Sequence, residues 1–223
     1  MSRDALQIEK NRIGTWGKIN IPRLEMILKY AGQPLLDAGC STGDYVKYLR
    51  KQGYQAFGLD LLTCPEWEAH REYFKSGDLS RMPFHEEEFD TVTAFEVLEH
   101  ILEPHQILQE IYRVVRRRII LSVPDAKLYP VFREAGLTFN HWVDRTHVQF
   151  FDRKSLTMLL HQNGFKVKHL HRINPVYPER MLFEDIGINP GLASRLTRLM
   201  RLVLPKRKFY MTLLAVADKE RIK

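Results

Sequence analysis

The sequence has little cysteine and no long apolar run. Only two cysteines, Cys40 and Cys64, occur in 223 residues, so a disulfide framework cannot hold the fold. No stretch approaches the roughly 18 apolar residues that a membrane-spanning helix needs. The first ten residues also lack the apolar core of a secretory signal peptide. These absences predict a soluble, cytoplasmic protein.

A large excess of charge of one sign is also absent. The 34 Lys+Arg against 27 Asp+Glu give a net charge of +7, which allows an anionic partner without specifying one. Hydrophobic residues make up 44% of the chain and charged residues 27%, which excludes a disordered protein. The length suits a single domain, and we expect residues 1–223 to form one.

Short apolar segments alternate with helical patterns through most of the chain. The expected strands are residues 35–38, 54–59, a brief one ending at Asp78, 89–95, 119–123, 165–170 and 209–216. This alternation predicts an α/β fold with an open, mostly parallel sheet and helices on both faces. Arg116 to Arg118 follow a helical pattern and are interpreted as a solvated helix end.

Two stretches interrupt this alternation, residues 125–151 and 174–207. In open α/β sheets, ligands bind outside the carboxyl ends of the strands. We therefore expect both insertions to be candidate covers over a bound substrate.

The turn after the first expected strand carries the clearest functional signal. Gly39 and Gly43 suit a tight connection between a strand and a helix. The dinucleotide-binding fingerprint requires glycines at positions i, i+2 and i+5, but those positions are Gly39, Ser41 and Asp44. A pyrophosphate site, and with it a nicotinamide-dependent enzyme, is disfavoured.

Asp37, Asp60 and Asp78 come at the ends of three consecutive expected strands. Asp60 lies 17 residues after Gly43, close to where a carboxylate can bind both hydroxyls of a ribose. One such acid could simply cap a turn, but three at one edge indicate a site for a cationic ligand.

In this order and spacing, residues 34 to 171 resemble class I S-adenosylmethionine-dependent methyltransferases. The matching segments are Leu35 to Gly43, Gly58-Leu-Asp60, Gly77-Asp78-Leu79, Met82-Pro-Phe84 with Phe89 to Val92, and Glu96-Val-Leu-Glu99-His100. The resemblance implies a Rossmann-like seven-stranded sheet whose last strand is antiparallel. Ser41 departs from the family, in which many members carry glycine, but serine is small enough for the turn.

The resemblance also implies that S-adenosylmethionine is the cofactor. The turn from Gly39 to Gly43 would hold its methionine part, Asp60 its ribose and Asp78 its adenine amino group. The full set of expected cofactor-binding residues is Asp37, Gly39, Cys40, Ser41, Gly43, Asp60, Asp78, Leu79 and Glu96.

Glu96, Glu99 and His100 are the first candidates on the acceptor side. On a helical turn, positions i, i+3 and i+4 share one face, so these side chains could meet. They resemble the Glu-x-x-Glu-His signature of ubiquinone-pathway O-methyltransferases and small-RNA terminal 2′-O-methyltransferases, in which it binds a divalent metal such as Mg²⁺. Alternatively, Glu99 bonds backbone near a helix start and His100 acts as a general base.

His141 and His147 are further catalytic candidates beside His100. Residues 140–151 resemble the loop that follows a strand in glycan, lipid and quinone methyltransferases. A structural role for His147, hydrogen-bonded within a packed loop, fits equally well.

Residues 190–208 combine apolar residues at helical spacing with a run of positive charge. The apolar set is Leu192, Leu196, Leu199 and Val203, and the basic set is Arg195, Arg198, Arg201, Lys206, Arg207 and Lys208. Two interpretations fit: a lid helix with its apolar face turned inward, or a helix lying on an anionic membrane.

The sequence thus predicts a methyltransferase acting on an oxygen of a small-molecule, sugar-linked or lipid-linked acceptor. An RNA 2′-O-methyltransferase is an alternative, but basic and aromatic residues do not interleave as in a base-stacking platform, which makes nucleic acid an unfavoured partner. A non-catalytic protein that retains a nucleoside pocket is the other alternative.

Overall fold

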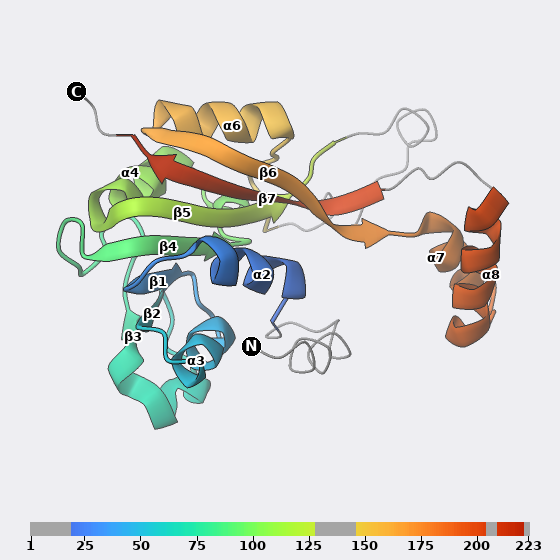
Figure 1. Ribbon diagram of the computed structural model, residues 1–223, viewed down its shortest axis with the longest axis horizontal. Helices are drawn as coiled ribbons and strands as arrows, with labels where there is room; N and C mark the ends of the chain where they lie inside the picture. The colour runs from blue at the N-terminus through green and yellow to red at the C-terminus, as the bar shows by residue number, and fades with distance from the viewer. Residues whose placement is uncertain (1–18, 128–145, 204–208, 221–223) are drawn as a thin grey trace.

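The computed structural model describes residues 19–127, 146–203 and 209–220. Their centre is a seven-stranded sheet with the order β3-β2-β1-β4-β5-β7-β6 (Figure 1). The strands are β1 (Leu35–Ala38), β2 (Ala56–Asp60), β3 (Phe74–Ser76), β4 (Phe89–Phe95), β5 (Val115–Pro124), β6 (Phe165–Val176) and β7 (Phe209–Lys219). β7 is antiparallel to both of its neighbours, and all other pairings are parallel. The expected α/β fold with an antiparallel last strand is confirmed.

Helices cover both faces of the sheet. The helical elements are α2 (Ile21–Tyr30), α3 (Asp44–Lys51), η1 (Pro65–Tyr73), η2 (Leu98–His100), α4 (Pro104–Val114), α6 (Arg153–Gln162), α7 (Pro178–Asp185) and α8 (Pro190–Val203). Apolar side chains of α2, α3 and η1 pack on one face, and those of α4 and α6 pack on the other. The sheet therefore lies between two layers of helices.

The starts of α4 and α6 agree with what the residues at their N-termini predict. Pro104 begins α4, and Ile107, Leu108 and Ile111 are buried on one face of that helix, as their spacing predicts. Asp152 caps α6 by accepting a hydrogen bond from the backbone N–H of Ser155 at 2.8 Å.

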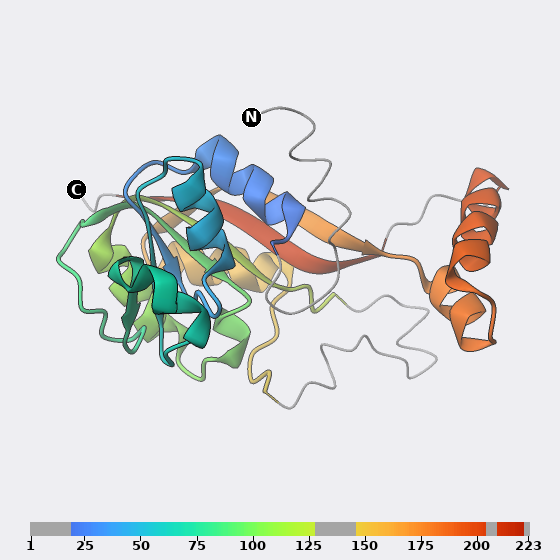
Figure 2. The ribbon, with the colours of Figure 1, turned by 90° about the horizontal axis from the view of Figure 1, so that it is seen from below.

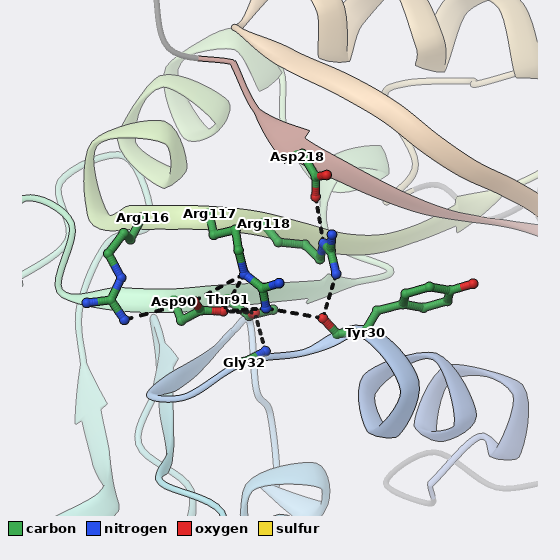
Figure 3. Close-up of polar contacts among 8 residues, drawn as sticks. All are labelled: Tyr30, Gly32, Asp90, Thr91, Arg116, Arg117, Arg118 and Asp218. Atoms are coloured by element: carbon green, nitrogen blue, oxygen red, sulfur yellow. Dashed lines mark hydrogen bonds and ion pairs between the residues drawn. The ribbon is translucent and has the colours of Figure 1, made fainter.

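The arginine run differs from its expected structure. Residues 116–118 lie in β5 and not at the end of α4. Figure 3 shows their side chains meeting carboxylates of neighbouring strands: Arg117 Nη2 lies 2.8 Å from Asp90 Oδ1, and Arg118 Nε lies 2.6 Å from Asp218 Oδ1. The interpretation as a solvated helix end was wrong because strand pairing brings acids from distant segments to these positions.

Strands β6 and β7 run on together beyond the neighbouring strands, and their far end carries α7 and α8 (Figures 1 and 2). The last paired residues are Val176 and Phe209. We call residues 177–203, which hold both helices, the α7–α8 hairpin. No helix in the described ranges is long and apolar enough to cross a membrane.

Candidate active site

The turn between β1 and α3 forms the centre of the candidate site. Gly43 caps α3 with a φ of +76°, and a Cβ there would lie 2.4 Å from the ring of Phe74. Ser41 also adopts a left-handed conformation, with a φ of +47°. Ser41 therefore occupies a backbone conformation that favours glycine, which explains why glycine is common there in the family it resembles.

Ser41 is held from both sides. Its backbone N–H donates to Asp60 Oδ2 at 2.8 Å, and its carbonyl accepts from Trp67 Nε1 at 2.9 Å. Trp67 is buried and stacks on Phe74 with ring centroids 4.9 Å apart. Trp67 is a site-forming residue that the sequence analysis missed, because only the folded chain brings η1 to the turn.

The three predicted acids lie on adjacent strands or just beyond them. Asp37 is buried within β1 and accepts a hydrogen bond from Thr93 Oγ1 at 2.7 Å. The pKa of Asp37 is raised to about 6, chiefly by burial; the hydrogen bond from Thr93 opposes this rise, and the negative charge of Asp60 adds to it. Asp78 lies two residues past β3, and the backbone N–H of Ser80 lowers its pKa.

This edge is chemically suited to a cation. The negative charge of Asp60 disfavours ionisation of Asp37, so a positive ligand beside the two carboxyls would relieve that repulsion. Burial, helped by the same two acids, raises the pKa of Cys40, which keeps its thiol neutral. The residues present therefore fit S-adenosylmethionine, which carries a sulfonium and an ammonium and no phosphate.

Glu96 follows β4 and is bound by groups on two other elements. Its φ is +54°, its N–H donates to the Ser122 carbonyl at 2.9 Å, and its carboxylate accepts from Ser122 Oγ at 2.9 Å and from Arg23. Arg23 is 14% exposed, and among the described residues its buried Nε has no hydrogen-bond partner. Arg23 belongs to no motif of the sequence analysis. It lies in α2, before the segments that resemble the methyltransferases.

Glu99, His100 and His147 form a second cluster. Their potential ligand atoms all lie within 4.8 Å of one another. Glu99 is buried, and the backbone N–H groups of Val148 and Gln149 donate to its carbonyl at 2.8 and 3.0 Å. This pairing brings the loop that contains His147 against η2.

The predicted grouping of Glu96 with Glu99 and His100 is not formed. A helical turn through all three was expected, but η2 covers only Leu98–His100 and Glu96 precedes it in a left-handed conformation. Glu96 consequently points to Arg23, and His147 takes its place in the cluster. His141 lies outside the described residues.

A cavity of about 510 Å³ lies beside η1 and β3. Its lining residues are Thr63, Cys64, Pro65, Trp67, Glu68, Arg71, Phe74 and Ser76. None of these is a predicted cofactor-binding residue; the predicted ones lie at the neighbouring carboxyl edge of β1 to β4.

Known proteins share both the sequence pattern and the fold. Residues 18–170 match a family described as "Methyltransferase domain". A ubiquinone biosynthesis O-methyltransferase of Hydrogenovibrio crunogenus is 30% identical over 83% of this chain and 86% of its own length. A relative of the same name in Pseudomonas savastanoi pv. phaseolicola is 27% identical over 71% of this chain and 76% of its own.

Solved structures agree on the fold. An S-adenosylmethionine-dependent methyltransferase of Archaeoglobus fulgidus has a TM-score of 0.63 at 16% identity and covers 98% of this chain and all of its own. A Burkholderia thailandensis N1-methyltransferase, solved with S-adenosylhomocysteine, has a TM-score of 0.60 at 19% identity and covers 90% of this chain and 77% of its own. With the matching family over most of the chain and an acid-lined edge suited to the cofactor, the chain belongs to the class I S-adenosylmethionine-dependent methyltransferases.

Proposed function

We propose that this methyltransferase methylates an oxygen atom of a small molecule, either free or linked to a sugar or lipid. The observation that carries the proposal is the cluster of Glu99, His100 and His147, which follows β4 at the same edge as the acids. The names of the ubiquinone-pathway relatives support an oxygen acceptor.

On this proposal the β1 turn and the acids hold the cofactor. Asp60 accepts hydrogen bonds from the ribose hydroxyls while it keeps the Ser41 N–H, Asp78 accepts from the adenine amino group, and Asp37 balances positive charge. The bound cofactor supplies a methyl group made electrophilic by a positively charged sulfur. The turn would orient that methyl group toward the acceptor, and such positioning supplies much of the acceleration.

His100 is suited to remove a proton from the acceptor. Its Nδ1 lies 3.2 Å from the carbonyl oxygen of Thr146, which favours the tautomer with the proton on Nδ1. Nε2 is then the basic nitrogen. The nearby carboxylate of Glu99 would stabilise the imidazolium that forms.

The same cluster is also a candidate metal site. One carboxylate and two imidazoles suit a transition ion such as Mn²⁺ or Zn²⁺ better than Mg²⁺, which prefers oxygen ligands. A metal there would lower the pKa of an acceptor hydroxyl, and Glu99, His100 and His147 would hold it.

The test is transfer of an isotopically labelled methyl group from the cofactor into small molecules of a cell extract. Carbon NMR of the labelled product separates O-methyl from N-methyl and S-methyl groups. We expect an O-methyl signal in the small-molecule fraction. Label found only on nitrogen, or only in RNA, would contradict the proposal.

A variant tests whether the cluster acts in catalysis, and a chelator tests whether it does so through a metal. His100→Ala should lower turnover by roughly 10²- to 10⁴-fold whether or not a metal is bound, whereas His161→Ala, an exposed histidine of α6, should not. If a metal is bound, a chelator should abolish turnover, leave S-adenosylhomocysteine binding intact, and be reversed by Mn²⁺ or Zn²⁺. Full activity of His100→Ala would remove the cluster from catalysis.

A further inference from the structure

The α7–α8 hairpin stands away from the rest of the molecule at the end of β6 and β7 (Figures 1 and 2). Its two helices pack on each other. Ala193 and Thr197 are the buried residues of α8, and Arg201 joins the helices through an ion pair with Glu179 at 2.6 Å. The guanidinium of Arg201 also lies 4.2 Å from the ring centroid of Tyr177. The hairpin is therefore a small folded unit with its own contacts.

Most of the apolar face of α8 is exposed, and only Leu196 of the four apolar residues predicted there is half-buried. A lid would bury Leu192, Leu199 and Val203 against the domain, yet they are 51%, 61% and 87% exposed. The small residues Ala193 and Thr197 are the buried ones instead, which leaves most of the apolar stripe beside them uncovered.

Apolar exposure is concentrated in this part of the molecule. Nine of the fifteen exposed large apolar side chains among the described residues lie between Tyr177 and Val203. They are Tyr177, Met181, Leu182, Ile186, Leu192, Leu199, Met200, Leu202 and Val203. An uncovered apolar surface of this kind marks a site of interaction.

The charge of the hairpin identifies the partner. Residues 177–203 contain four basic and three acidic side chains, and the sequence adds Lys206, Arg207 and Lys208 just after them. Glu179 and Glu184 are neutralised by ion pairs within the hairpin, whereas exposed Arg195 and Arg198 have no ion-pair partner among the described residues. An apolar stripe flanked by unpaired arginines matches the boundary between acyl chains and anionic headgroups.

We propose that the α7–α8 hairpin docks the enzyme on an anionic lipid surface, with its apolar stripe in the acyl boundary and Arg195 and Arg198 on the headgroups. β6 runs parallel to β5, so the hairpin extends from the carboxyl side of the sheet, where the acceptor site lies. Docking there places the candidate active site on the side of the molecule that faces the lipid.

The test is co-sedimentation of the whole protein with phosphatidylcholine vesicles, with and without phosphatidylglycerol, at low and high salt. We expect binding that requires phosphatidylglycerol and weakens with salt. Replacing both Arg195 and Arg198 by glutamine should weaken it about twentyfold to thirtyfold, and replacing Leu199 and Val203 by serine about tenfold or more.

Matched control variants lie on other parts of the surface. Lys154→Gln with Lys168→Gln removes two exposed positive charges, and Met158→Ser removes a side chain that is 53% exposed. Neither should change vesicle binding. Light scattering of the soluble protein, and its thermal shift with S-adenosylhomocysteine, check the oligomeric state and folding of every variant.

Three outcomes would overturn the proposal. The first is the absence of sedimentation at low salt with anionic vesicles. The second is binding that depends on the arginines but not on Leu199 and Val203, which would indicate a polyanion and not a lipid surface. The third is a dimer that the serine substitutions convert to a monomer, which would assign the apolar stripe to a second copy of the chain.

Discussion

At the scale of single residues, Asp60 has two tasks. Its carboxylate holds the Ser41 N–H at 2.8 Å and, on our proposal, accepts the ribose hydroxyls. Because the second task depends on charge and the first only on an oxygen atom, Asp60→Ala and Asp60→Asn should differ.

Asp60→Ala should weaken S-adenosylhomocysteine binding by about 1.5–3 kcal/mol, since the ribose loses a charged acceptor and the turn loses an anchor. Asp60→Asn keeps an oxygen for the Ser41 N–H and should lose less. Titration calorimetry of both variants gives the comparison. An unchanged affinity in Asp60→Ala would remove the ribose assignment.

Asp37 should make stability depend on pH. Its pKa is about 6 in the folded protein against 3.8 for an unperturbed carboxyl, so the folded state binds the proton more tightly. The stability gained from this proton is present below about pH 4 and is lost as the pH rises toward 6. At neutral pH the buried charge is therefore a cost to the folded protein.

Asp37→Asn should raise the free energy of unfolding at pH 7 by up to about 3 kcal/mol and by less than about 1 kcal/mol at pH 4. Denaturant titrations at the two pH values measure this difference. Asp78→Asn is the control with the opposite expectation. The pKa of Asp78 is lowered, so removing its charge should not stabilise the protein. Equal stability of Asp37→Asn and the parent at pH 7 would show that the burial cost is absent.

The acids could be predicted at this scale, but their environments could not. The positions of Asp37, Asp60 and Asp78 at the ends of expected strands are enough to identify them. The bond between Asp37 and Thr93, which lies 56 residues away, exists only once β1 and β4 pair. Arg23 was missed for the same reason, since its partner Glu96 lies 73 residues away.

At the scale of elements, η1 supports the cofactor turn from outside. Trp67 donates to the Ser41 carbonyl and stacks on Phe74, which in turn fills the space beside Gly43. One hydrogen bond and one ring stack thus connect η1 to the turn. A substitution can remove the hydrogen bond and keep the stack.

Trp67→Phe should retain the stack and lose the hydrogen bond. We expect S-adenosylhomocysteine affinity to fall about twofold to tenfold, with a change in unfolding free energy of about 1 kcal/mol or less. Tyr73→Phe, in the same element, is the control. An affinity equal to that of the parent would show that the turn does not need η1.

Helices were predicted correctly where the residues that define them lie within the helix or at its end. The apolar spacing in α4 and the cap at Asp152 lie within the helices that they define. The early start of β5 was missed because it depends on pairing with β4, not on neighbouring residues. The candidate catalytic cluster gained His147 for a similar reason, since the backbone of Val148 and Gln149 bonds to Glu99, which is distant in the sequence.

At the scale of the whole molecule, the sheet and the hairpin are separable units. The alternation of strands and helices was enough to predict the sheet. It could not place the α7–α8 hairpin, because a lid and a membrane helix share one amphipathic pattern. The structure adds which side chains of α8 are buried, Ala193 and Thr197, and our membrane proposal rests on the exposure of Leu192, Leu199 and Val203.

Removing the hairpin should leave the domain intact. Val176 and Phe209 are cross-strand partners, so a two-residue Asn-Gly turn can join β6 to β7 in place of residues 177–208. The shortened protein should unfold cooperatively and bind S-adenosylhomocysteine within about threefold of the parent, because the hairpin helices pack on each other. Circular dichroism melts and calorimetry test this, and loss of cofactor binding would mean that the hairpin completes the cofactor site.

The central claim is that the acid-lined carboxyl edge of β1 to β4 binds S-adenosylmethionine. The most direct test compares the melting temperature of the unmodified protein with S-adenosylhomocysteine and with NAD. A ligand at one hundred times its dissociation constant stabilises the folded state by about 2.7 kcal/mol. We predict a clear rise with S-adenosylhomocysteine and none with NAD. A rise with NAD alone, or no rise with S-adenosylhomocysteine at saturating concentration, would contradict the account.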